Sequence, residues 1–197
     1  KRTQLPPIPE PLPAMSFPET ELVPFTSVWD NMPAPVHSVQ PRPLEAFGQD
    51  YGFMLYTTEL IGHKGGKLTV TELHDYATVF LDGKYLGTLD RRLGINSIDL
   101  PRSSSERPVL EIFVEGMGRI NFAHAMIDRK GITDRVMLNG MTLMNWDIHG
   151  LPMNDLFVAS LRETSGDKTK PGIFFRGILN LNQTADTFID MTNFVKG

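Results

Sequence analysis

From Gly48 onward, short runs of apolar and polar residues predict a chain made of β-strands. Leu110, Ile112 and Val114 alternate with charged or aromatic residues, which places the three aliphatic side chains on one face of a strand. We expect strands of ordinary length at residues 52–60, 67–72, 77–81, 84–88, 109–115, 136–138 and 141–148.

Two dipeptides predict tight hairpin turns. Asp82-Gly83 and Asn139-Gly140 each lie between apolar runs and supply the positive-φ residues that two-residue hairpins require. Helical periodicity is weak throughout, and only residues 154–161 are expected to form a short helix. Many short strands with turn signals about ten residues apart predict an all-β, antiparallel β-sandwich or jelly roll, which we assign to residues 44–165.

Proline is concentrated at the start of the chain, where 11 of the 15 prolines lie in the first 43 residues. Because proline fixes φ and removes an amide donor, we expect residues 1–43 to form an extended linker rather than a helix or an interior strand. A flexible tether is the alternative. Apolar residues within this stretch favour a linker that lies along a protein surface: Leu5, Ile8, Leu12, Phe17, Leu22, Phe25 and Trp29.

Two segments of the chain share a similar residue pattern, which we call the echo. The pattern of residues 53–60 and 67–70, which predicts a long strand, a polar bend and a second strand, recurs at residues 173–180 and 187–190. Duplication and coincidence both account for it. If it is a duplication, residues 171–197 open a partial second β-sandwich, or they supply strands that complete the first. Their edges must then pair with the first sandwich, another chain, or sequence beyond Gly197.

Charge and composition exclude several classes of partner. Lys and Arg total 19 against 23 acidic residues, and the net charge of −4 provides no basic field for nucleic acid. The absence of cysteine excludes disulfides, thiolate nucleophiles and cysteine-based zinc sites. No apolar run reaches the roughly 18 residues of a membrane helix, so no membrane partner is expected.

Candidate catalytic and metal-binding groups are sparse. Glu111 and Glu115 share a strand face at about 13 Å, farther apart than a glycosidase carboxylate pair, and we expect both to be exposed. His74-Asp75 is the best isolated candidate, and a hydrogen bond explains it better than metal binding. We therefore predict no catalytic residue, no metal and no cofactor, since no two histidines have metal-site spacing: His37, His63, His74, His124 and His149.

Three local patterns have competing interpretations. Along the strand, Asp147 and His149 lie on one face and Trp146 lies on the other. Trp146 either belongs to the core or an interface, or it stacks against a bound sugar. The run 128–130 predicts a local salt bridge. The segment 115–124 has two glycines followed by Arg119 and Asn121, which predicts a constrained loop that contacts a sugar or a neighbouring domain.

Five motifs follow one another along the chain: Phe47-Gly-Gln-Asp-Tyr-Gly-Phe-Met-Leu-Tyr56, Leu73-His-Asp-Tyr-Ala-Thr-Val-Phe-Leu-Asp-Gly83, Gly87-Thr-Leu-Asp-Arg-Arg92, Val114-Glu-Gly-Met-Gly-Arg-Ile-Asn-Phe122 and Pro171-Gly-Ile-Phe-Phe-Arg176. In this order they resemble the region downstream of the catalytic barrel in glycoside hydrolase family 35 β-galactosidases. The resemblance runs from about Trp29 to the last residue. It implies a periplasmic or extracellular bacterial protein.

The resemblance implies a non-catalytic part of a larger enzyme. In that family a (β/α)₈ barrel carries both catalytic glutamates and hydrolyses terminal β-linked galactose with retention. The expected partner is therefore a barrel on the same polypeptide, and this chain alone is expected to be inactive. Residues Arg119, Asn121 and Phe122 are expected at the active-site rim. Family members often have Tyr at the last of these positions, so only an aromatic wall is retained here.

Two other functions remain open. A carbohydrate-binding module would hold galactosides on exposed aromatic side chains, for which the sequence offers Tyr51, Tyr85, Phe122 and Trp146. An independent hydrolase would need its own carboxylate pair. Fold labels alone do not establish sugar binding.

Overall fold

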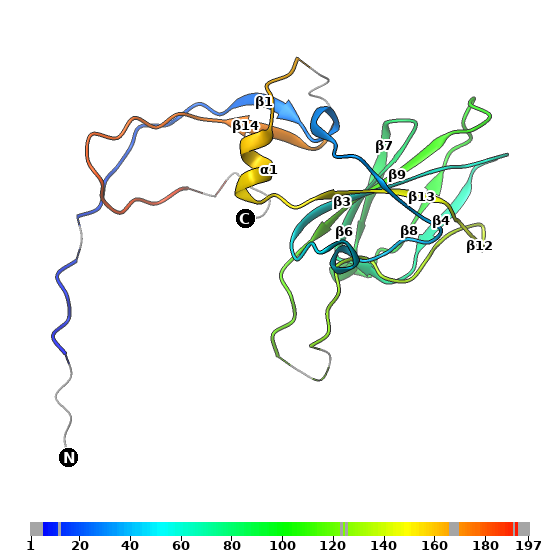
Figure 1. Cartoon of the computed structure of the whole chain (residues 1–197), viewed down its shortest axis with the longest axis horizontal. Coiled ribbons are helices and arrows are strands. Elements are labelled where there is room, and N and C mark those ends of the chain that lie inside the picture. Colours follow the sequence, from blue (N-terminus) through cyan, green and yellow to red (C-terminus); the bar gives the residue numbers. More distant parts are fainter. Residues whose placement is uncertain are drawn as a thin grey trace.

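Two antiparallel sheets face each other in the computed structural model, which describes residues 6–11, 13–122, 124, 126–165, 170–190 and 192 (Figure 1). The six-stranded sheet has the order β2 (Val36–Ser38), β13 (Trp146–Leu151), β3 (Gly52–Glu59), β9 (Val109–Gly116), β6 (Tyr76–Leu81), β7 (Lys84–Asp90). The four-stranded sheet has the order β12 (Met141–Thr142), β11 (Val136–Leu138), β4 (Gly66–Val70), β8 (Ser97–Leu100).

Smaller elements complete the fold. Two further strand pairs are β1 (Val23–Ser27) with β14 (Ile173–Arg176), and β5 (Leu73–His74) with β10 (Gly131–Ile132). The helical elements are η1 (Trp29–Asn31), η2 (Leu44–Phe47), η3 (Arg91–Leu93) and α1 (Asp155–Ser160). All ten strand pairings among the described residues are antiparallel, and the predicted all-β sandwich is therefore confirmed.

The main core lies between the two sheets. Leu110, Ile112 and Val114 of β9 are all buried there, as the alternation predicts. Phe113 faces the other side of the same sheet and belongs to a second cluster with Val28, Leu55, Phe80 and Leu151. The centre of the six-stranded sheet is thus covered on both faces.

Both predicted hairpin turns are confirmed. Asp82 and Gly83 have φ values of 49° and 74°, and they connect β6 to β7. Asn139 and Gly140, at 51° and 82°, connect β11 to β12. The short helix is also confirmed as α1, where the Asn154 side chain accepts a hydrogen bond from the amide of Phe157.

The single strand predicted at residues 141–148 is wrong, because the chain changes sheets inside it. Residues 141–142 pair with β11 in one sheet, whereas β13 pairs with β2 and β3 in the other. Asn145 lies at the crossing with φ of 63° and donates its amide to the carbonyl of Val39. This crossing contact is tertiary, so alternation along the sequence does not reveal it.

The proline-rich first 43 residues include the strands β1 and β2, which the sequence pattern did not predict. β2 is the edge strand of the six-stranded sheet, and β1 pairs with β14. Trp29 packs against this sheet, with its ring centroid 5.2 Å from that of Phe80. Ile8 and Leu22 remain exposed.

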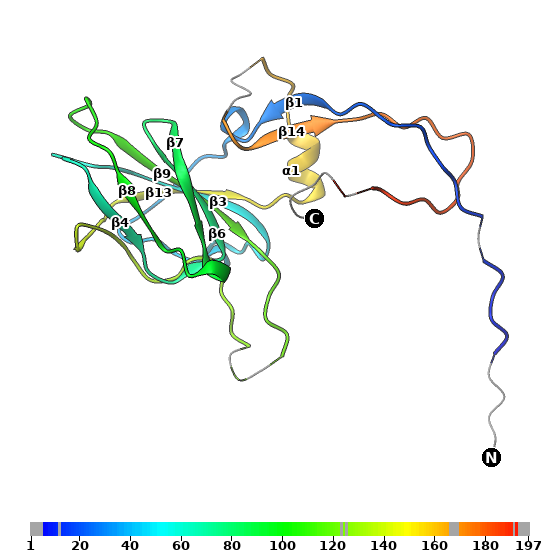
Figure 2. The ribbon, with the colours of Figure 1, turned by 180° about the vertical axis from the view of Figure 1, so that it is seen from behind.

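In the C-terminal copy of the echo, β14 is the only strand among the described residues 173–190. It pairs with β1, so the first strand of the echo is shorter than the predicted 173–180. Residues 187–190 form no strand, and the strand expected there is wrong. Figure 2 shows the β1–β14 ribbon standing apart from the two sheets, with α1 beside β14, and Figure 1 shows the same arrangement from the other side.

Candidate functional site at the 117–130 loop

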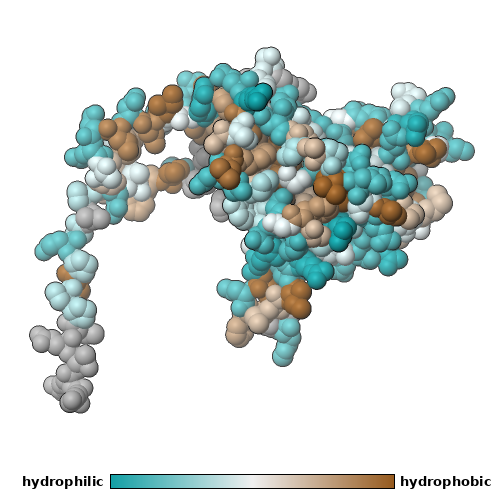
Figure 3. All heavy atoms as spheres, in the orientation of Figure 1, coloured by the Kyte–Doolittle hydropathy of each residue, from teal (hydrophilic) through white to brown (hydrophobic). Residues whose placement is uncertain are grey.

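The loop between β9 and β10, residues 117–130, projects beyond the end of the sandwich (Figure 1). Its tip carries exposed apolar side chains, including Phe122 (88% exposed), Met126 and Ile127 (87% exposed). Figure 3 shows apolar residues on this projection. Exposed apolar groups gathered on a projecting loop are typical of a contact surface.

A buried lysine fixes the base of this loop. The Lys130 side chain is only 1% exposed, and its ammonium lies 2.7 Å from carboxylate oxygens of both Asp75 and Asp128. It also donates to the carbonyl of Gly118 at 3.0 Å. All three ammonium donors therefore have acceptors, which is the condition for burying a charge.

Asp75 connects the loop to the sheet. Its carboxylate also accepts from the amide of Met117 at 2.9 Å and from the guanidinium of Arg91 at 2.9 Å. The same Arg91 nitrogen lies 2.9 Å from Asp128. The pKa of Arg91 is raised, first by its hydrogen bond with Asp75, so this cation remains charged. Two carboxylates and two cations thus neutralise one another at the loop base.

Asp128 ties the two stems of the loop together. Its carboxylate accepts from the amide of Ile120 at 3.2 Å, in addition to its bonds with Lys130 and Arg91. Burial alone would raise the pKa of Asp128, but the hydrogen bonds from Lys130, Arg91, Ile120 and His74 outweigh it. The pKa of Asp128 therefore lies well below its ordinary value.

Arg119, predicted as a rim residue, also holds the loop in place. Its guanidinium donates to the carbonyl of Asp128 at 2.7 Å and to the carbonyl of Asp50 at 2.5 Å, and it pairs with Glu45 at 2.6 Å. The guanidinium is therefore engaged by acceptors of the protein itself. Of the predicted rim residues, Asn121 and Phe122 occupy the exposed end of the loop, and their contact with substrate stays a prediction.

His74 lies beside this network. Its Nδ1 is 3.2 Å from Asp128, and its Nε2 is 3.2 Å from Glu72. The predicted hydrogen-bonding role is confirmed. The local salt bridge predicted for residues 128–130 is confirmed as well, in the buried pair described above. Among the described residues, no group of three or more histidines and acids could hold a metal ion.

The proposed sugar-stacking residues do not form one surface. Trp146 is fully buried, its ring centroid lies 6.5 Å from that of Tyr56, and its Nε1 donates to a core carbonyl, so sugar stacking at Trp146 is wrong. Its core alternative is confirmed. Tyr51 is exposed next to Asp50, close to the base of the loop. Tyr85 is also exposed, but it follows the turn at the far end of β6.

The exposure predicted for Glu111 is wrong. Its side chain is 14% exposed and lies 3.1 Å from the ammonium of Lys170. It also accepts from the amide of Gly83 at 2.8 Å. Lys170 in turn lies 3.3 Å from the centre of the Trp29 ring, in cation–π geometry. Glu111 is thus an anchor for the segment that leads to β14.

The buried ion-pair cluster of Lys130, Asp75, Asp128 and Arg91 could be predicted only in part from the sequence. The run 128–130 indicated one ion pair, but nothing near it indicated Asp75 or Arg91. Asp75 lies 55 residues from Lys130 along the chain. The bond forms because β10 pairs with β5, so that Lys130 and Asp75 flank the paired residues Gly131 and His74, which is a property of the folded topology.

The two stacked antiparallel sheets define an all-β sandwich domain. A family model described as "Beta-galactosidase, first all-beta domain" matches residues 41–152, and the chain belongs to this family. The chain is 36% identical to a beta-galactosidase of Xanthomonas manihotis, over 98% of this chain and 32% of the relative. It is 33% identical to beta-galactosidase-1-like protein 3 of Rattus norvegicus, over 98% and 32%.

A third relative, beta-galactosidase 1 of Dictyostelium discoideum, is 28% identical over 98% of this chain and 33% of its own length. The chain thus spans about a third of the length of the relatives it matches. These similarities show that the chain is a non-catalytic, accessory all-β domain of the β-galactosidase family. The resemblance found in the sequence motifs is confirmed. No helix of the described residues is long and apolar enough to cross a membrane.

Proposed function

We propose that this chain packs against a catalytic barrel on the same polypeptide and that its 117–130 loop shapes the rim of the active site. The catalytic partner hydrolyses terminal β-linked galactose with retention. The main observation in support of this proposal is that the loop tip exposes apolar side chains while buried ion pairs hold its two stems in place. A periplasmic or extracellular location, which rests on the family resemblance, is part of this proposal.

The clamped stems suit a positioning role. A flexible loop loses conformational freedom when it binds a partner, and this loss subtracts from the affinity. Here Lys130, Asp128 and Arg119 already connect both stems through three separate hydrogen bonds. The tip can therefore present Phe122 and Ile127 to a neighbouring domain without a large ordering cost.

We also propose a division of the chain into an extended linker at residues 1–43, which lends β2 to the sandwich and β1 to β14, a sandwich at residues 44–165, and the opening of a second β unit at residues 171–197. The start of the family-model match at residue 41 supports the boundary between the linker and the sandwich. β1 and β14 both lie outside that match. Their pairing supports a unit separate from the sandwich.

The loop hypothesis is tested by Phe122→Ala in the complete polypeptide that contains this chain. We expect kcat/KM for a nitrophenyl galactoside to fall at least tenfold, because the aromatic wall of the rim is lost. The matched control is Ile61→Ala, since Ile61 is 78% exposed and follows β3 at the other end of the sandwich. Equal rates for both variants and the parent would contradict the proposal.

Galactoside binding by the sandwich itself is the second candidate. The observation in its favour is that Tyr51 is exposed beside the base of the loop that carries Phe122. Calorimetric titration of this 197-residue chain with galactose, lactose and galactan oligomers separates the two functions. Millimolar or tighter binding that Tyr51→Ala abolishes favours a binding module, and no heat of binding favours the accessory role.

A further inference from the structure

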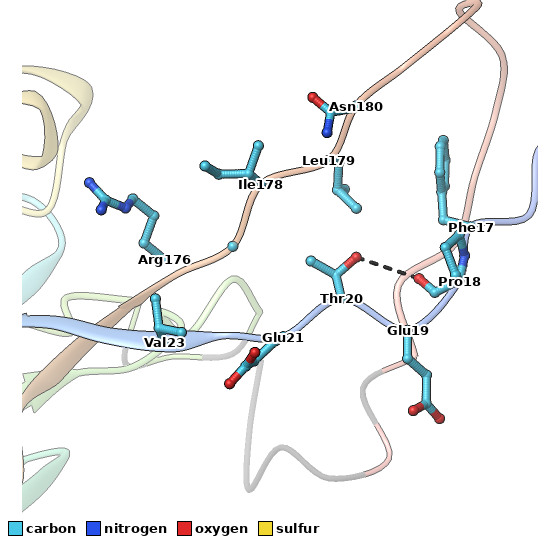
Figure 4. A pocket seen from close by; sticks show the side chains of 11 residues that line it. Phe17, Pro18, Glu19, Thr20, Glu21, Val23, Arg176, Ile178, Leu179 and Asn180 are labelled. Carbon is cyan, nitrogen blue, oxygen red and sulfur yellow. Dashed lines mark hydrogen bonds between the residues drawn. The ribbon is translucent and has the colours of Figure 1, made fainter.

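A small hollow on the sandwich differs in its lining from a larger hollow on the ribbon. The larger one, of about 540 Å³, lies between residues 17–23 and 176–180, and Figure 4 shows Phe17, Ile178 and Leu179 around it. Its walls belong to the segments that continue the β1–β14 ribbon. The small one, of about 240 Å³, is lined mainly by polar side chains of the sandwich. Its lining includes Glu72, His74, Arg91, Ile95 and Asn96.

Arg91 presents a fixed guanidinium to the small hollow. Its Nη1 lies 2.9 Å from carboxylate oxygens of both Asp75 and Asp128, so the protein holds this side of the planar group. Within the described residues, its Nε and Nη2 have no hydrogen-bond acceptor. The side chain is 37% exposed, which lets a ligand reach these donors. A guanidinium that is held on one side is already oriented for a ligand on the other, and this lowers the ordering cost of binding.

An acceptor and a second donor complete the polar wall. The Glu72 carboxylate lies 3.2 Å from Nε2 of His74, whose Nδ1 lies 3.2 Å from Asp128, so Glu72 is connected to the cluster that holds the guanidinium. Asn96 is exposed, and its side-chain amide has no hydrogen-bond partner in the part of the chain that the structure describes. Ile95, 43% exposed, adds an apolar contact. The hollow therefore offers donors, acceptors and a small apolar surface together.

The charges around the hollow favour a neutral ligand. Asp75 and Asp128 balance the two cations of the loop base, and Glu72 adds a further carboxylate, so an anion gains little here. A divalent cation lacks its ligands, because the described residues include no group of three or more histidines and acids that could hold one. The hollow is also smaller than the roughly 300 Å³ at which sites for drug-sized ligands begin, so it suits a single small ring.

We propose that this hollow is a carbohydrate-binding site for one neutral sugar ring. Sugar hydroxyls both donate and accept hydrogen bonds, so one ring accepts from Arg91 and Asn96 and donates to Glu72. The nonpolar C–H face of the ring packs on Ile95. Tyr51 does not line the hollow, so this site is separate from the exposed tyrosine of the second candidate function.

The site lies at the base of the 117–130 loop, because the same Arg91 guanidinium bonds Asp128. A sugar chain with one ring in the hollow is therefore held near the loop that the proposed function places at the active-site rim. The choice of galactosides as ligands rests on that proposed function. The preference for a neutral sugar rests on the hollow alone.

NMR titration of the ¹⁵N-labelled 197-residue chain with methyl β-galactoside and methyl β-glucoside tests the site. We expect the Arg91 Nε–H and Asn96 side-chain amide resonances to shift together, with a Kd of roughly 1–10 mM for a ligand of single-sugar size. Inorganic phosphate, the anionic probe, should leave both resonances in place. An absence of shifts with both sugars, or a larger response to phosphate, would overturn the proposal.

Variants of exposed residues locate the bound sugar. Asn96→Ala removes a donor and Glu72→Gln replaces a charged acceptor by a neutral one, and each is expected to weaken binding by about threefold to tenfold. Asn180→Ala, at an exposed asparagine of the larger hollow, is the matched control and should leave the Kd unchanged. Unchanged affinity in the first two variants, or binding that Tyr51→Ala abolishes, would overturn the proposal. Because the readout is sugar binding rather than hydrolysis, failure here is distinguishable from failure of the loop hypothesis.

Discussion

The sandwich and the β1–β14 ribbon are both antiparallel β-structure, but only the sandwich has a core of its own. Its two sheets enclose twenty buried apolar residues in one cluster. The ribbon contributes Phe174 to the edge of the second cluster and leaves Phe175 exposed. Strand pairing alone therefore does not make a stable unit, because the buried apolar surface supplies most of the folding free energy.

The two regions also differ in how they are anchored. The 117–130 loop is held by charges that are almost fully buried, at Lys130 and Asp128. Besides Phe174, the ribbon is held to the sandwich by Lys170, whose side chain is 16% exposed and contacts Trp29 and Glu111. Ion pairs that are shielded from water respond far more strongly to the loss of a partner than exposed pairs do. The following predictions use this difference, from the largest expected effect to the smallest.

Lys130→Ala is expected to lower the free energy of unfolding by about 3–5 kcal/mol, because it leaves Asp75 and Asp128 buried without their cation. Urea denaturation of the 197-residue chain measures this loss. Lys84→Ala, on an exposed strand end, is the control and should change stability by less than about 0.5 kcal/mol. Similar values for the two variants would show that the cluster does not stabilise the loop base.

Acid should weaken the sandwich through Asp128. Its pKa in the folded chain is below the ordinary value of 3.8, so the unfolded chain binds more protons between these two values. The free energy of unfolding is therefore expected to be fully supported by this group above about pH 5 and to fall as the pH drops through 4 and below. Denaturation midpoints measured from pH 7 to pH 3 give the slope of stability against pH. Asp128→Asn should flatten it, and an unchanged slope would contradict the assignment to Asp128.

Lys170→Ala is expected to have the smallest effect on global stability, about 2 kcal/mol or less, since it removes the cation–π contacts with Trp29 and Phe80 and one ion pair. Its main effect should be local, as faster amide exchange at Gly172 and along β14. Lys170→Arg, which keeps the charge, should restore much of the protection. Uniform loss of protection across both sheets would mean that the ribbon and the sandwich unfold as one unit.

Local chemistry was sufficient to predict several elements. The two turn dipeptides needed positive φ, and both have it. The alternation in β9 fixed which of its residues face the main core. The short helix was predicted at residues 154–161, and Asn154 caps it. These features depend on a residue and its near neighbours, so the sequence pattern contains them.

Features that depend on distant contacts were missed or wrong. The crossing at Asn145 depends on Val39, and the burial of Glu111 depends on Lys170. Lys130 is paired with Asp75, which no local spacing connects to it. The sequence therefore predicted a constrained loop at residues 115–124, whereas the role of Arg119 as a clamp of this loop could be recognised only after the fold placed Asp50 and Glu45 beside it.

The central claim is that the 117–130 loop touches the catalytic domain, and site-specific photo-crosslinking tests it most directly. A benzophenone amino acid replaces Phe122 in the complete polypeptide, and Ile61 serves as the control position. We predict that the label at residue 122 captures peptides of the catalytic domain close to its active site, while the label at residue 61 captures none of them. The claim would be contradicted if the label at residue 122 formed no crosslink, or if it formed crosslinks only within the sandwich itself.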